Sequence, residues 1–313
     1  MQAARTLKEL VEAGAGELKW SEGGARENPR REASLLLQAA VGLDRNQMVI
    51  HGDQTAAPGA AARYWEMVRR RARGLPLQLL VGHSGFHDVT LAVEPGVFIP
   101  RPETESLVEQ AVRGVEAALA ADAASSGDVA AAGPAFRADT RVTVLDLCTG
   151  TGAVAVAVAH RFRREERVSV HAGDWSLRAV RLARRNAESN EITVDVRRSD
   201  LFSAFADLEG RVNVLAANPP YIARAERESL PVEVRLGDPE DALFDPDGGT
   251  GFHRRIAGRG RDFLRAGGVL AVEIGDRQGD EVSALLHELE YEDVAVLRDL
   301  AGRDRVVRGR RPR

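Results

Sequence analysis

From residue 142 onward, apolar strand patterns alternate with helical patterns, and this alternation restricts the fold more than any other feature of the sequence. The predicted strands cover residues 142–147, 168–174, 194–198, 212–217, 269–274 and 294–297. Helical patterns lie between them, at residues 153–163, 177–187, 252–264 and 282–289. Strands that are apolar throughout and alternate with helices are typical of a parallel sheet with helices on both faces. The sequence therefore predicts an α/β domain with a mostly parallel sheet.

The first 80 residues carry helical patterns instead, with apolar positions at helical spacing over residues 32–40 and 64–73. We expect the arginines of the second pattern, within residues 69–73, to form a solvated outer face. This block contains no group of residues that suggests catalysis. We therefore predict a helical substrate-docking domain over residues 1–80.

The rest of the chain divides into a linker and a catalytic domain. Residues 81–103 contain alternating apolar positions at 89–93, which indicates a β-hairpin linker. The catalytic domain is expected over residues 104–313, with Thr104 as the cap of its first helix. A stretch rich in Ala, Ser and Gly at residues 117–140 is expected to be a flexible insertion.

Composition excludes several classes of protein. The single cysteine cannot form an internal disulfide, which excludes a disulfide-stabilised secreted scaffold. No apolar run reaches the roughly 18 residues of a membrane span, and the N-terminal residues are too charged for a signal peptide. With a net charge of −4, the chain offers no broad basic surface for nucleic acid. We expect a cytoplasmic protein that binds neither membranes nor nucleic acid directly.

A glycine-containing loop, DLCTGTG at residues 146–152, follows the first of these strands and opens a helix. A loop in this position can bring backbone N–H groups against a ligand. Ala155 stands where a dinucleotide-binding fingerprint has its third glycine, and no Gly-Lys-Ser/Thr follows. Neither a dinucleotide loop nor a phosphate loop therefore fits. The residues expected to contact the ligand are Asp146, Cys148, Thr149, Gly150, Thr151 and Gly152.

Two further strand ends carry candidate ligand-binding residues. Asp174 ends the second strand, where an acidic side chain can accept both ribose hydroxyls of an adenosine. Leu201 follows the third strand, where an apolar side chain can lie against an adenine ring. Because ligands of such sheets bind outside the carboxyl ends of the strands, the three segments together predict a nucleoside-containing ligand there.

The segment Asn218-Pro219-Pro220-Tyr221, which follows the fourth strand, contains the predicted catalytic and substrate-binding residues. The prolines make the loop rigid and leave two acceptors, the Asn218 side-chain oxygen and the Pro219 carbonyl, directed into the crevice. These acceptors can hold both hydrogens of a planar NH2 group while Tyr221 packs across its plane. An amide or aryl amine nitrogen is a poor nucleophile because its lone pair is delocalised, so we expect catalysis by orientation. Without a general base, the rate should vary little between roughly pH 7 and 9.

The glycine loop, Asp174 and the NPPY segment together resemble S-adenosylmethionine-dependent methyltransferases that act on planar amino groups. Several segments are similar to the HemK/PrmC family: FIPRPETE (98–105), NPPYI (218–222), DGGTGFHRRI (247–256), GGVLAVEIGDRQG (267–279) and DLAGRDRVV (299–307). The resemblance spans nearly the whole chain. It implies a Rossmann-like catalytic domain and methylation of the glutamine in the Gly-Gly-Gln motif of class 1 peptide chain release factors.

The resemblance also implies S-adenosylmethionine as cofactor, held by the glycine loop, Asp174 and Leu201, with Asn218 touching its methionine part. Two positions depart from the family pattern. Cys148 replaces the first glycine of the loop, so this position must tolerate a small side chain. Leu201 replaces an aromatic residue that some members carry beside the adenine, which leaves apolar contact but no stacking there.

Three alternative functions stay open. A nucleic-acid adenine methyltransferase shares the NPPY geometry, but the acidic net charge disfavours it. A family that methylates a ribosomal protein glutamine is closer, but its hairpin segment departs from RPETE. A non-catalytic adaptor is disfavoured because all cofactor and amide-binding positions are filled. No motif predicts a metal site. Cys148 is not expected to act as a nucleophile, because no general base is apparent beside it. The acidic stretch 238–247 is expected to be a solvated loop over the crevice.

Overall fold

The computed structural model describes residues 5–21, 24–25, 27–127 and 141–313 of the chain. The chain forms two compact units. The first comprises Met1–His83 and Ser229–Asp238, and the second comprises Ser84–Glu228 and Pro239–Arg313. Among the helices in the described ranges, none has the length and apolar character that crossing a bilayer requires.

The first unit is helical. It contains α1 (Leu7–Lys19), α2 (Pro29–Val41), α3 (Arg45–Ile50), α4 (Pro58–Ala72), α5 (Leu77–Val81) and α9 (Val232–Gly237), with a short antiparallel pair of β1 (Trp20–Ser21) and β2 (Gly24–Ala25). The two helical patterns predicted from the sequence correspond to α2 and α4. Asn28 starts α2 by accepting the backbone N–H of Arg31. Tyr64 on α4 is fully buried and donates to the Leu10 carbonyl of α1 at 2.9 Å, which joins these two helices.

Arg71 contradicts the predicted solvated arginine face of α4. Its side chain is only 5% exposed and pairs with Glu32 at 2.7 Å and with Glu233 at 2.9 Å. It also donates to the Leu75 carbonyl. Helical spacing does not predict this burial, because both carboxylate partners are distant in the sequence. The pair with Glu233 is one link between α4 and the segment Ser229–Asp238, which belongs to the first unit, although sequence patterns alone assign that segment to the catalytic domain.

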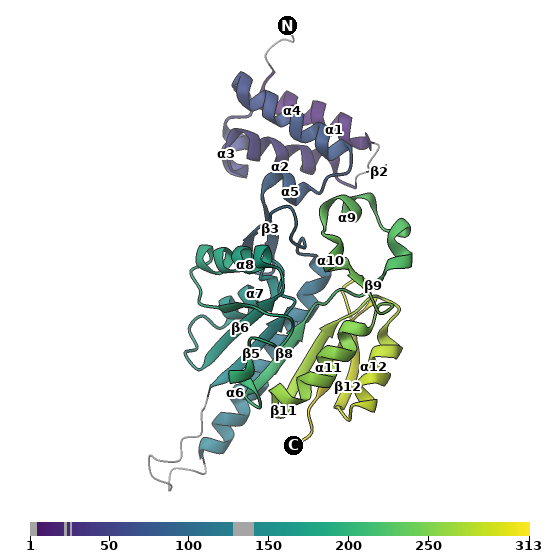
Figure 1. The fold of residues 1–313 in the computed structure, drawn as a ribbon. Helices are drawn as coiled ribbons and strands as arrows, with labels where there is room; N and C mark the ends of the chain where they lie inside the picture. Colours follow the sequence, from purple (N-terminus) through teal and green to yellow (C-terminus); the bar gives the residue numbers. More distant parts are fainter. Residues whose placement is uncertain (1–4, 22–23, 26, 128–140) are drawn as a thin grey trace. The chain divides into compact units, whose positions relative to one another are not determined.

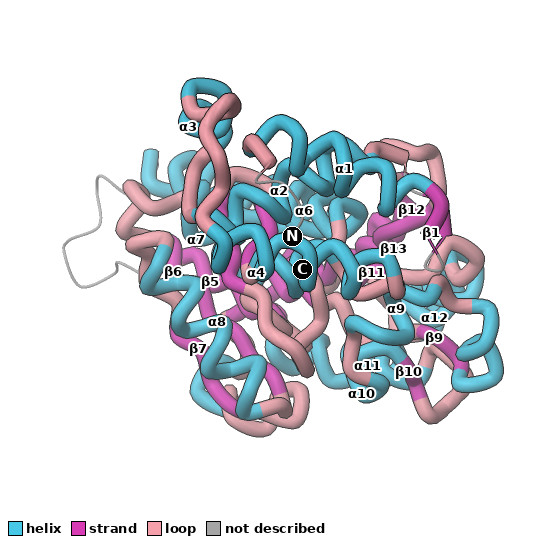
Figure 2. The backbone as a smooth tube through the Cα atoms, turned by 90° about the horizontal axis from the view of Figure 1, so that it is seen from above, coloured by secondary structure: helices cyan, strands magenta, loops and turns pink. Residues whose placement is uncertain are grey.

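The second unit is built on one seven-stranded sheet with the order β12-β13-β11-β8-β5-β6-β7. Its strands are β5 (Val142–Leu147), β6 (Val168–Asp174), β7 (Asp195–Arg198), β8 (Val212–Ala217), β11 (Leu264–Glu273), β12 (Glu292–Arg298) and β13 (Asp304–Arg310). The pairs from β7 through β11 are parallel, and β13 pairs antiparallel with both β11 and β12. In Figure 2, β5, β6 and β7 lie toward one side and β11, β12 and β13 toward the other. This arrangement confirms the predicted Rossmann-like α/β fold, although the sequence analysis did not predict β13.

The direction of strand addition reverses between β5 and β8. From β5 the chain continues outward to β6 and β7, and it then returns to β8 on the other side of β5 and continues to β11. Loops that leave the carboxyl ends of two such strands diverge, and ligands of α/β sheets usually bind in the crevice between them. The glycine loop follows β5 and the NPPY segment follows β8. Both predicted site segments therefore lie at this crevice.

Helices cover both faces of the sheet: α6 (Glu105–Gly127), α7 (Ala153–Arg161), α8 (Leu177–Ser189), α11 (Gly251–Phe263) and α12 (Gly279–Glu288) (Figure 1). Val144 and Val214 pack in one hydrophobic cluster with α6, α7 and α8. The next strand residues, Leu145 and Leu215, pack in a second cluster with α11 and α12. Side chains of successive strand residues therefore point to opposite faces of the sheet, because the strands are pleated.

Helix α6 corrects part of the predicted flexible insertion. Residues 117–127 belong to this helix, whereas residues 128–140 lie outside the described part of the chain. A composition rich in alanine led to the prediction of a flexible linker, but alanine is also the residue with the highest helix propensity.

A small sheet supports the glycine loop. It pairs β3 (His83–Phe86) with β4 (Val89–Ala92). Asn186 on α8 accepts the backbone N–H of Ala92 at 2.8 Å and donates to the carbonyl of Thr151 at 2.8 Å. One fully buried side chain therefore links β4 to the glycine loop.

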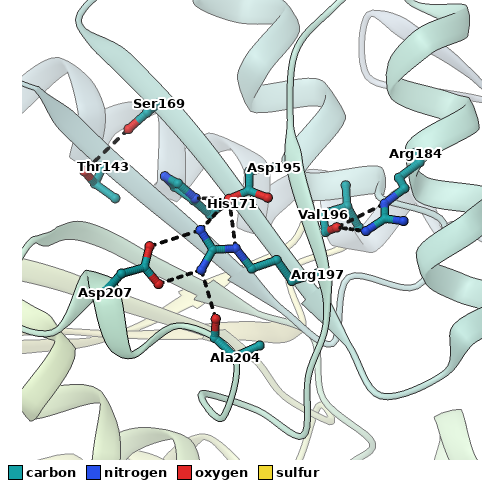
Figure 3. A network of polar contacts seen from close by, with 9 residues as sticks. All are labelled: Thr143, Ser169, His171, Arg184, Asp195, Val196, Arg197, Ala204 and Asp207. Atoms are coloured by element: carbon teal, nitrogen blue, oxygen red, sulfur yellow. Dashed lines mark hydrogen bonds and ion pairs between the residues drawn. The ribbon is translucent and has the colours of Figure 1, made fainter.

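Arg197 on β7 organises one edge of the sheet (Figure 3). Its guanidinium pairs with Asp195 at 2.6 Å and with Asp207 at 2.6 Å, and it donates to the Ala204 carbonyl at 2.9 Å. Asp195 also lies 3.0 Å from the imidazole of His171 on β6. The network fixes the loop after β7, which carries one of the predicted cofactor contacts.

We predict that Arg197→Gln lowers the free energy of unfolding by about 1–2 kcal/mol at neutral pH, because it removes charge-assisted hydrogen bonds to two carboxylates and a carbonyl. Urea unfolding measures this change. Arg185→Gln is the matched control: it removes one exposed pair, with Glu94 at 2.7 Å. The control should change stability by less than about 0.5 kcal/mol. Equal effects of the two substitutions would contradict a special role for the Arg197 network.

The effect of Arg197→Gln should also depend on pH. Partial burial opposes ionisation of Asp195, but hydrogen bonds from Arg197 and His171 outweigh it and lower the pKa of this carboxyl. The hydrogen bond from Arg197 likewise lowers the pKa of Asp207. A carboxyl whose pKa is lowered by folding contributes stability above its unfolded pKa and loses it on acidification. The difference between wild type and variant should therefore shrink from neutral pH toward roughly pH 3.

Candidate active site

A cavity of about 760 Å³ opens at the carboxyl ends of β5, β6, β7 and β8, within the second unit. Its volume lies in the range of small-molecule sites. Segment 96–104, which was not predicted as part of the site, and segment 239–246, which was expected to lie over the crevice, also contribute to its wall. The predicted site residues that line it are Asp146, Cys148, Thr149, Gly150, Thr151, Asp174, Leu201, Asn218, Pro219, Pro220 and Tyr221.

Gly152 does not line the cavity, in contrast to the prediction. It precedes α7 with a φ of +83°, a conformation that side chains disfavour. A Cβ atom there would lie 3.0 Å from the Cβ of Ala183 and 3.2 Å from its Cα. Gly152 therefore allows α7 and α8 to approach each other, and its role is structural.

Asp146 holds the glycine loop from inside. Its carboxylate accepts the Thr149 hydroxyl at 2.5 Å and the backbone N–H of Ala155, at the start of α7, at 3.2 Å. Burial raises the pKa of Asp146 to about 7, which the two hydrogen bonds only partly oppose. The side chain thus ties the end of β5 to α7.

Cys148 adopts a left-handed backbone with φ +58°, close to the +55° of Gly150. This conformation is the physical reason that a glycine suits position 148. Burial raises the pKa of the Cys148 thiol well above its ordinary value, and the charges of Asp174 and Asp146 act in the same direction. The thiol is therefore no activated nucleophile. In the described ranges, no cluster of three or more His, Cys, Asp or Glu residues could hold a metal ion.

Asp174 links the end of β6 to the glycine loop. One carboxylate oxygen accepts the backbone N–H of Gly150 at 2.9 Å, and the other accepts that of Ser176 at 2.9 Å. Burial raises the pKa of this carboxyl, although both hydrogen bonds favour its ionised form. Each oxygen keeps a lone pair for a further donor, as two ribose hydroxyls would require.

The loop after β7 presents Leu201 with a φ of +47°. The Ser199 hydroxyl fixes this conformation by donating to the Leu201 carbonyl at 2.6 Å and accepting the Ala204 N–H at 3.0 Å. Trp175 also lines the cavity and is 56% exposed. Trp175 was not among the predicted site residues, although an aromatic residue directly after the acidic strand end was a usable signal.

Asn218 is oriented by a residue from another part of the sequence. Its amide nitrogen Nδ2 donates to the Thr104 hydroxyl at 3.2 Å. Thr104 lies in a short 3₁₀ turn, Pro102–Thr104, directly before α6. It was predicted only as the cap of that helix, but its hydroxyl also accepts a hydrogen bond from Asn218. Because the nitrogen is held by Thr104, the amide oxygen Oδ1 is the atom left to accept a donor.

The rest of the NPPY segment is held through its backbone. Gln278 donates through Nε2 to the carbonyl of Tyr221 at 3.0 Å and to that of Gly249 at 3.0 Å. Its Oε1 accepts the Gly275 N–H at 2.8 Å. One amide therefore joins the NPPY segment to the DGGTG segment at 247–251. Gln278 lies within the family-like stretch GDRQG, but spacing alone gave no reason to select it.

Glu273, at the end of β11, lies behind Tyr221. Its carboxylate Oε1 is 3.5 Å from the Tyr221 hydroxyl, and the residue is 1% exposed. Burial raises the pKa of Glu273 to about 7, while the Thr104 hydroxyl and the charge of Arg305 oppose this shift. Burial also raises the pKa of Tyr221. Sequence patterns do not predict Glu273, because an acidic residue at a strand end has many possible uses.

The predicted solvated loop at 238–247 is corrected at two of its acidic residues. Asp238 and Asp245 are buried. Asp245 accepts the backbone N–H groups of Asp247 at 3.0 Å, Gly249 at 3.1 Å and Gly251 at 2.5 Å. Between them, α10 (Glu240–Leu243) lines the cavity, and β10 (Phe244–Asp245) pairs with β9 (Ile222–Ala223) directly after the NPPY segment.

Known proteins resemble the chain over most of its length. Residues 9–82 match the family described as PrmC N-terminal domain, and residues 133–236 match the Methyltransferase small domain. The release factor glutamine methyltransferase of Streptomyces coelicolor is 37% identical, over 91% of this chain and 92% of that protein. That of Mycolicibacterium smegmatis is 38% identical, over 89% of each chain.

A solved structure with a similar fold is the hMettl16 catalytic domain in complex with a 3′UTR hairpin. It is 14% identical, with a TM-score of 0.50 over 83% of this chain and 84% of that one. This likeness concerns the fold alone. The sequence identities to the bacterial relatives, over nearly whole chains, are far higher. The chain belongs to the release factor glutamine methyltransferase family.

Proposed function

We propose that this protein transfers the methyl group of S-adenosylmethionine to the side-chain amide nitrogen of the glutamine in the Gly-Gly-Gln motif of class 1 peptide chain release factors. The observation that carries the proposal is the orientation of the Asn218 amide, whose nitrogen is held by Thr104. Its oxygen and the Pro219 carbonyl are then two acceptors for the two hydrogens of one NH2 group. The names of the relatives support a release factor as the substrate.

The cofactor supplies an activated methyl group, so the protein has to aim the amide nitrogen. Two acceptors that hold both N–H bonds fix the plane of the amide and direct its nitrogen at the methyl carbon. Bound S-adenosylmethionine would supply the methyl group and keep the electron pair of its C–S bond on sulfur, and the amide nitrogen would release one proton to solvent. Acceptors placed in advance also stabilise the positive charge that develops on the N–H groups.

An assay with methyl-labelled S-adenosylmethionine tests the proposal. A purified class 1 release factor should become labelled, and the same factor with Gln→Ala in its Gly-Gly-Gln motif should not. Labelling of duplex DNA or of a ribosomal protein, without labelling of the release factor, would support one of the alternative substrates. Since release factors act in translation, the proposal places the protein in the cytoplasm.

The proposed cofactor site predicts a loss of affinity in Asp174→Ala. Losing two hydrogen bonds to the ribose should weaken binding by about 2–3 kcal/mol. Trp175 provides the measurement, because it lines the cavity and is the one tryptophan of the second unit. Titration with S-adenosylhomocysteine should change its fluorescence, and Trp175→Phe should abolish the change. Glu94→Ala removes a carboxylate outside the cavity and should bind as wild type does. Unchanged affinity in Asp174→Ala would refute the ribose assignment.

The proposed role of the NPPY segment predicts a loss of rate in Asn218→Ala. Removal of one preorganised acceptor should lower kcat by about 10²–10³-fold. Affinity for S-adenosylhomocysteine, measured through Trp175, should change much less. Tyr221→Phe should be mild and Tyr221→Ala severe, because packing of the ring across the amide matters more than its hydroxyl. A kcat of Asn218→Ala within threefold of wild type would exclude the orientation mechanism.

We also propose that the first unit, which contains the predicted docking domain over residues 1–80, contacts the release factor away from the chemistry. Val49 and Ile50 on α3 are each 74% exposed and offer an apolar contact. The double substitution Val49→Ser and Ile50→Ser should raise KM for the intact release factor about tenfold, the effect of losing one good interface contact. Leu300→Ser is the matched control, since this fully exposed residue lies in the second unit. Equal KM values in all three proteins would refute docking through α3.

A further inference from the structure

The side-chain amide of Gln278, directly before α12, hydrogen-bonds the backbone around Tyr221 with both its nitrogen and its oxygen. Its Nε2 donates to the carbonyls of Tyr221 and Gly249, each at 3.0 Å, and its Oε1 accepts the Gly275 N–H at 2.8 Å. Among side chains, only Asn and Gln combine an NH2 group with a carbonyl oxygen. An apolar side chain at position 278 would therefore leave all three of these backbone groups without this partner.

Two glycines let this amide come close to the backbone. Gly249 has a φ of +113°, and a Cβ atom there would lie 2.8 Å from Gln278 Nε2 and 3.0 Å from the Tyr221 carbonyl oxygen. A Cβ atom on Gly275 would lie 3.1 Å from Gln278 Oε1 and 3.6 Å from Cδ2 of the Tyr221 ring. The ring therefore lies close to the backbone of Gly275. One side chain thus holds both the carbonyl of Tyr221 and the backbone beside its ring.

Asn186 on α8 makes a matching set of three hydrogen bonds beside the glycine loop. Its Nδ2 donates to the carbonyls of Thr151 at 2.8 Å and Ala92 at 3.2 Å, and its Oδ1 accepts the Ala92 N–H at 2.8 Å. Thr151 lines the cavity in the loop that is proposed to hold the cofactor. The two amides therefore bind the same kinds of backbone group in different loops, one at the proposed cofactor site and the other at the NPPY segment.

We propose that Gln278 is a positioning residue for methyl transfer, which sets the plane of the Tyr221 ring, and that Asn186 positions the glycine loop instead. In the proposed mechanism the Tyr221 ring packs across the substrate amide, so a shift of its backbone moves the plane in which that amide is held. A misplacement of about 1 Å can lower a rate about 10²-fold. This kinetic consequence rests on the function proposed above, but the control of Tyr221 by Gln278 does not.

Fluorine NMR tests the control of Tyr221 without a substrate. The chain has three tyrosines, so incorporated fluorotyrosine reports on each of them, and the Tyr221 signal is the one lost in Tyr221→Phe. Gln278→Met keeps the length of the side chain but removes its hydrogen-bonding groups, and it should shift or broaden this signal. Asn186→Leu, which removes the matching amide, should leave the signal unchanged. An identical Tyr221 signal in wild type and Gln278→Met would overturn the proposal, and so would an equal change in both variants.

Rate and cofactor affinity should separate between the two variants. In Gln278→Met, kcat should fall about tenfold or more, while affinity for S-adenosylhomocysteine, measured through Trp175, should change less than about threefold. In Asn186→Leu, that affinity should fall about tenfold, and kcat at saturating S-adenosylmethionine should fall less than about threefold. Equal losses of kcat in the two variants would show that any loosening of the site slows the reaction, which would overturn the specific role of Gln278.

A second variant keeps the test valid if urea unfolding shows that Gln278→Met is not folded. Gly249→Ala leaves the amide in the chain, but its Cβ atom would displace Gln278 Nε2, so it should reproduce both the changed Tyr221 signal and the loss of kcat. A folded Gly249→Ala enzyme with the wild-type signal and rate would overturn the proposal. Failure of wild type itself to methylate the release factor would count against the proposed substrate, and the NMR result would then decide the role of Gln278.

Discussion

Buried carboxylates that accept backbone N–H groups hold the loops around the cavity. Asp146 joins β5 to the start of α7, Asp174 joins β6 to the glycine loop, and Asp245 closes the turn before α11. A charge removed from water is tolerated only when it is hydrogen-bonded, so each carboxylate fixes the segment whose N–H groups it needs. The cavity can therefore be open to ligands and still have walls of defined geometry.

The same burial sets the electrostatic character of the cavity. Both Asp146 and Asp174 have raised pKa values, chiefly because burial disfavours their ionised forms. A positively charged ligand in the cavity would favour the ionised forms of both carboxylates. The sulfonium and ammonium groups of the proposed cofactor have that charge. Burial thus connects the rigidity of the loops to the class of ligand that suits them.

The sequence predicted the sheet core closely, because β5, β6 and β8 are largely apolar and face helices on both sides. It failed at β13, where charged residues flank Val306 and Val307 and hide a strand that is buried at its centre. The predicted site residues that lie at strand ends, such as Asp174 and Asn218, line the cavity. Gly152 lies in the predicted loop, but there the lack of a side chain allows α7 and α8 to pack closely.

Residues that act through a partner distant in the sequence could not be predicted from local patterns. The burial of Arg71 depends on Glu233, and the orientation of Asn218 depends on Thr104, more than a hundred residues earlier in the chain. Spacing predicts which side chains share a face or a loop, but it carries no information on which atom of an amide is held. That choice is made by Thr104, whose hydroxyl accepts from Asn218 Nδ2. In a site proposed to work by orientation, the decisive variable is therefore a hydrogen-bond direction, which only the assembled fold defines.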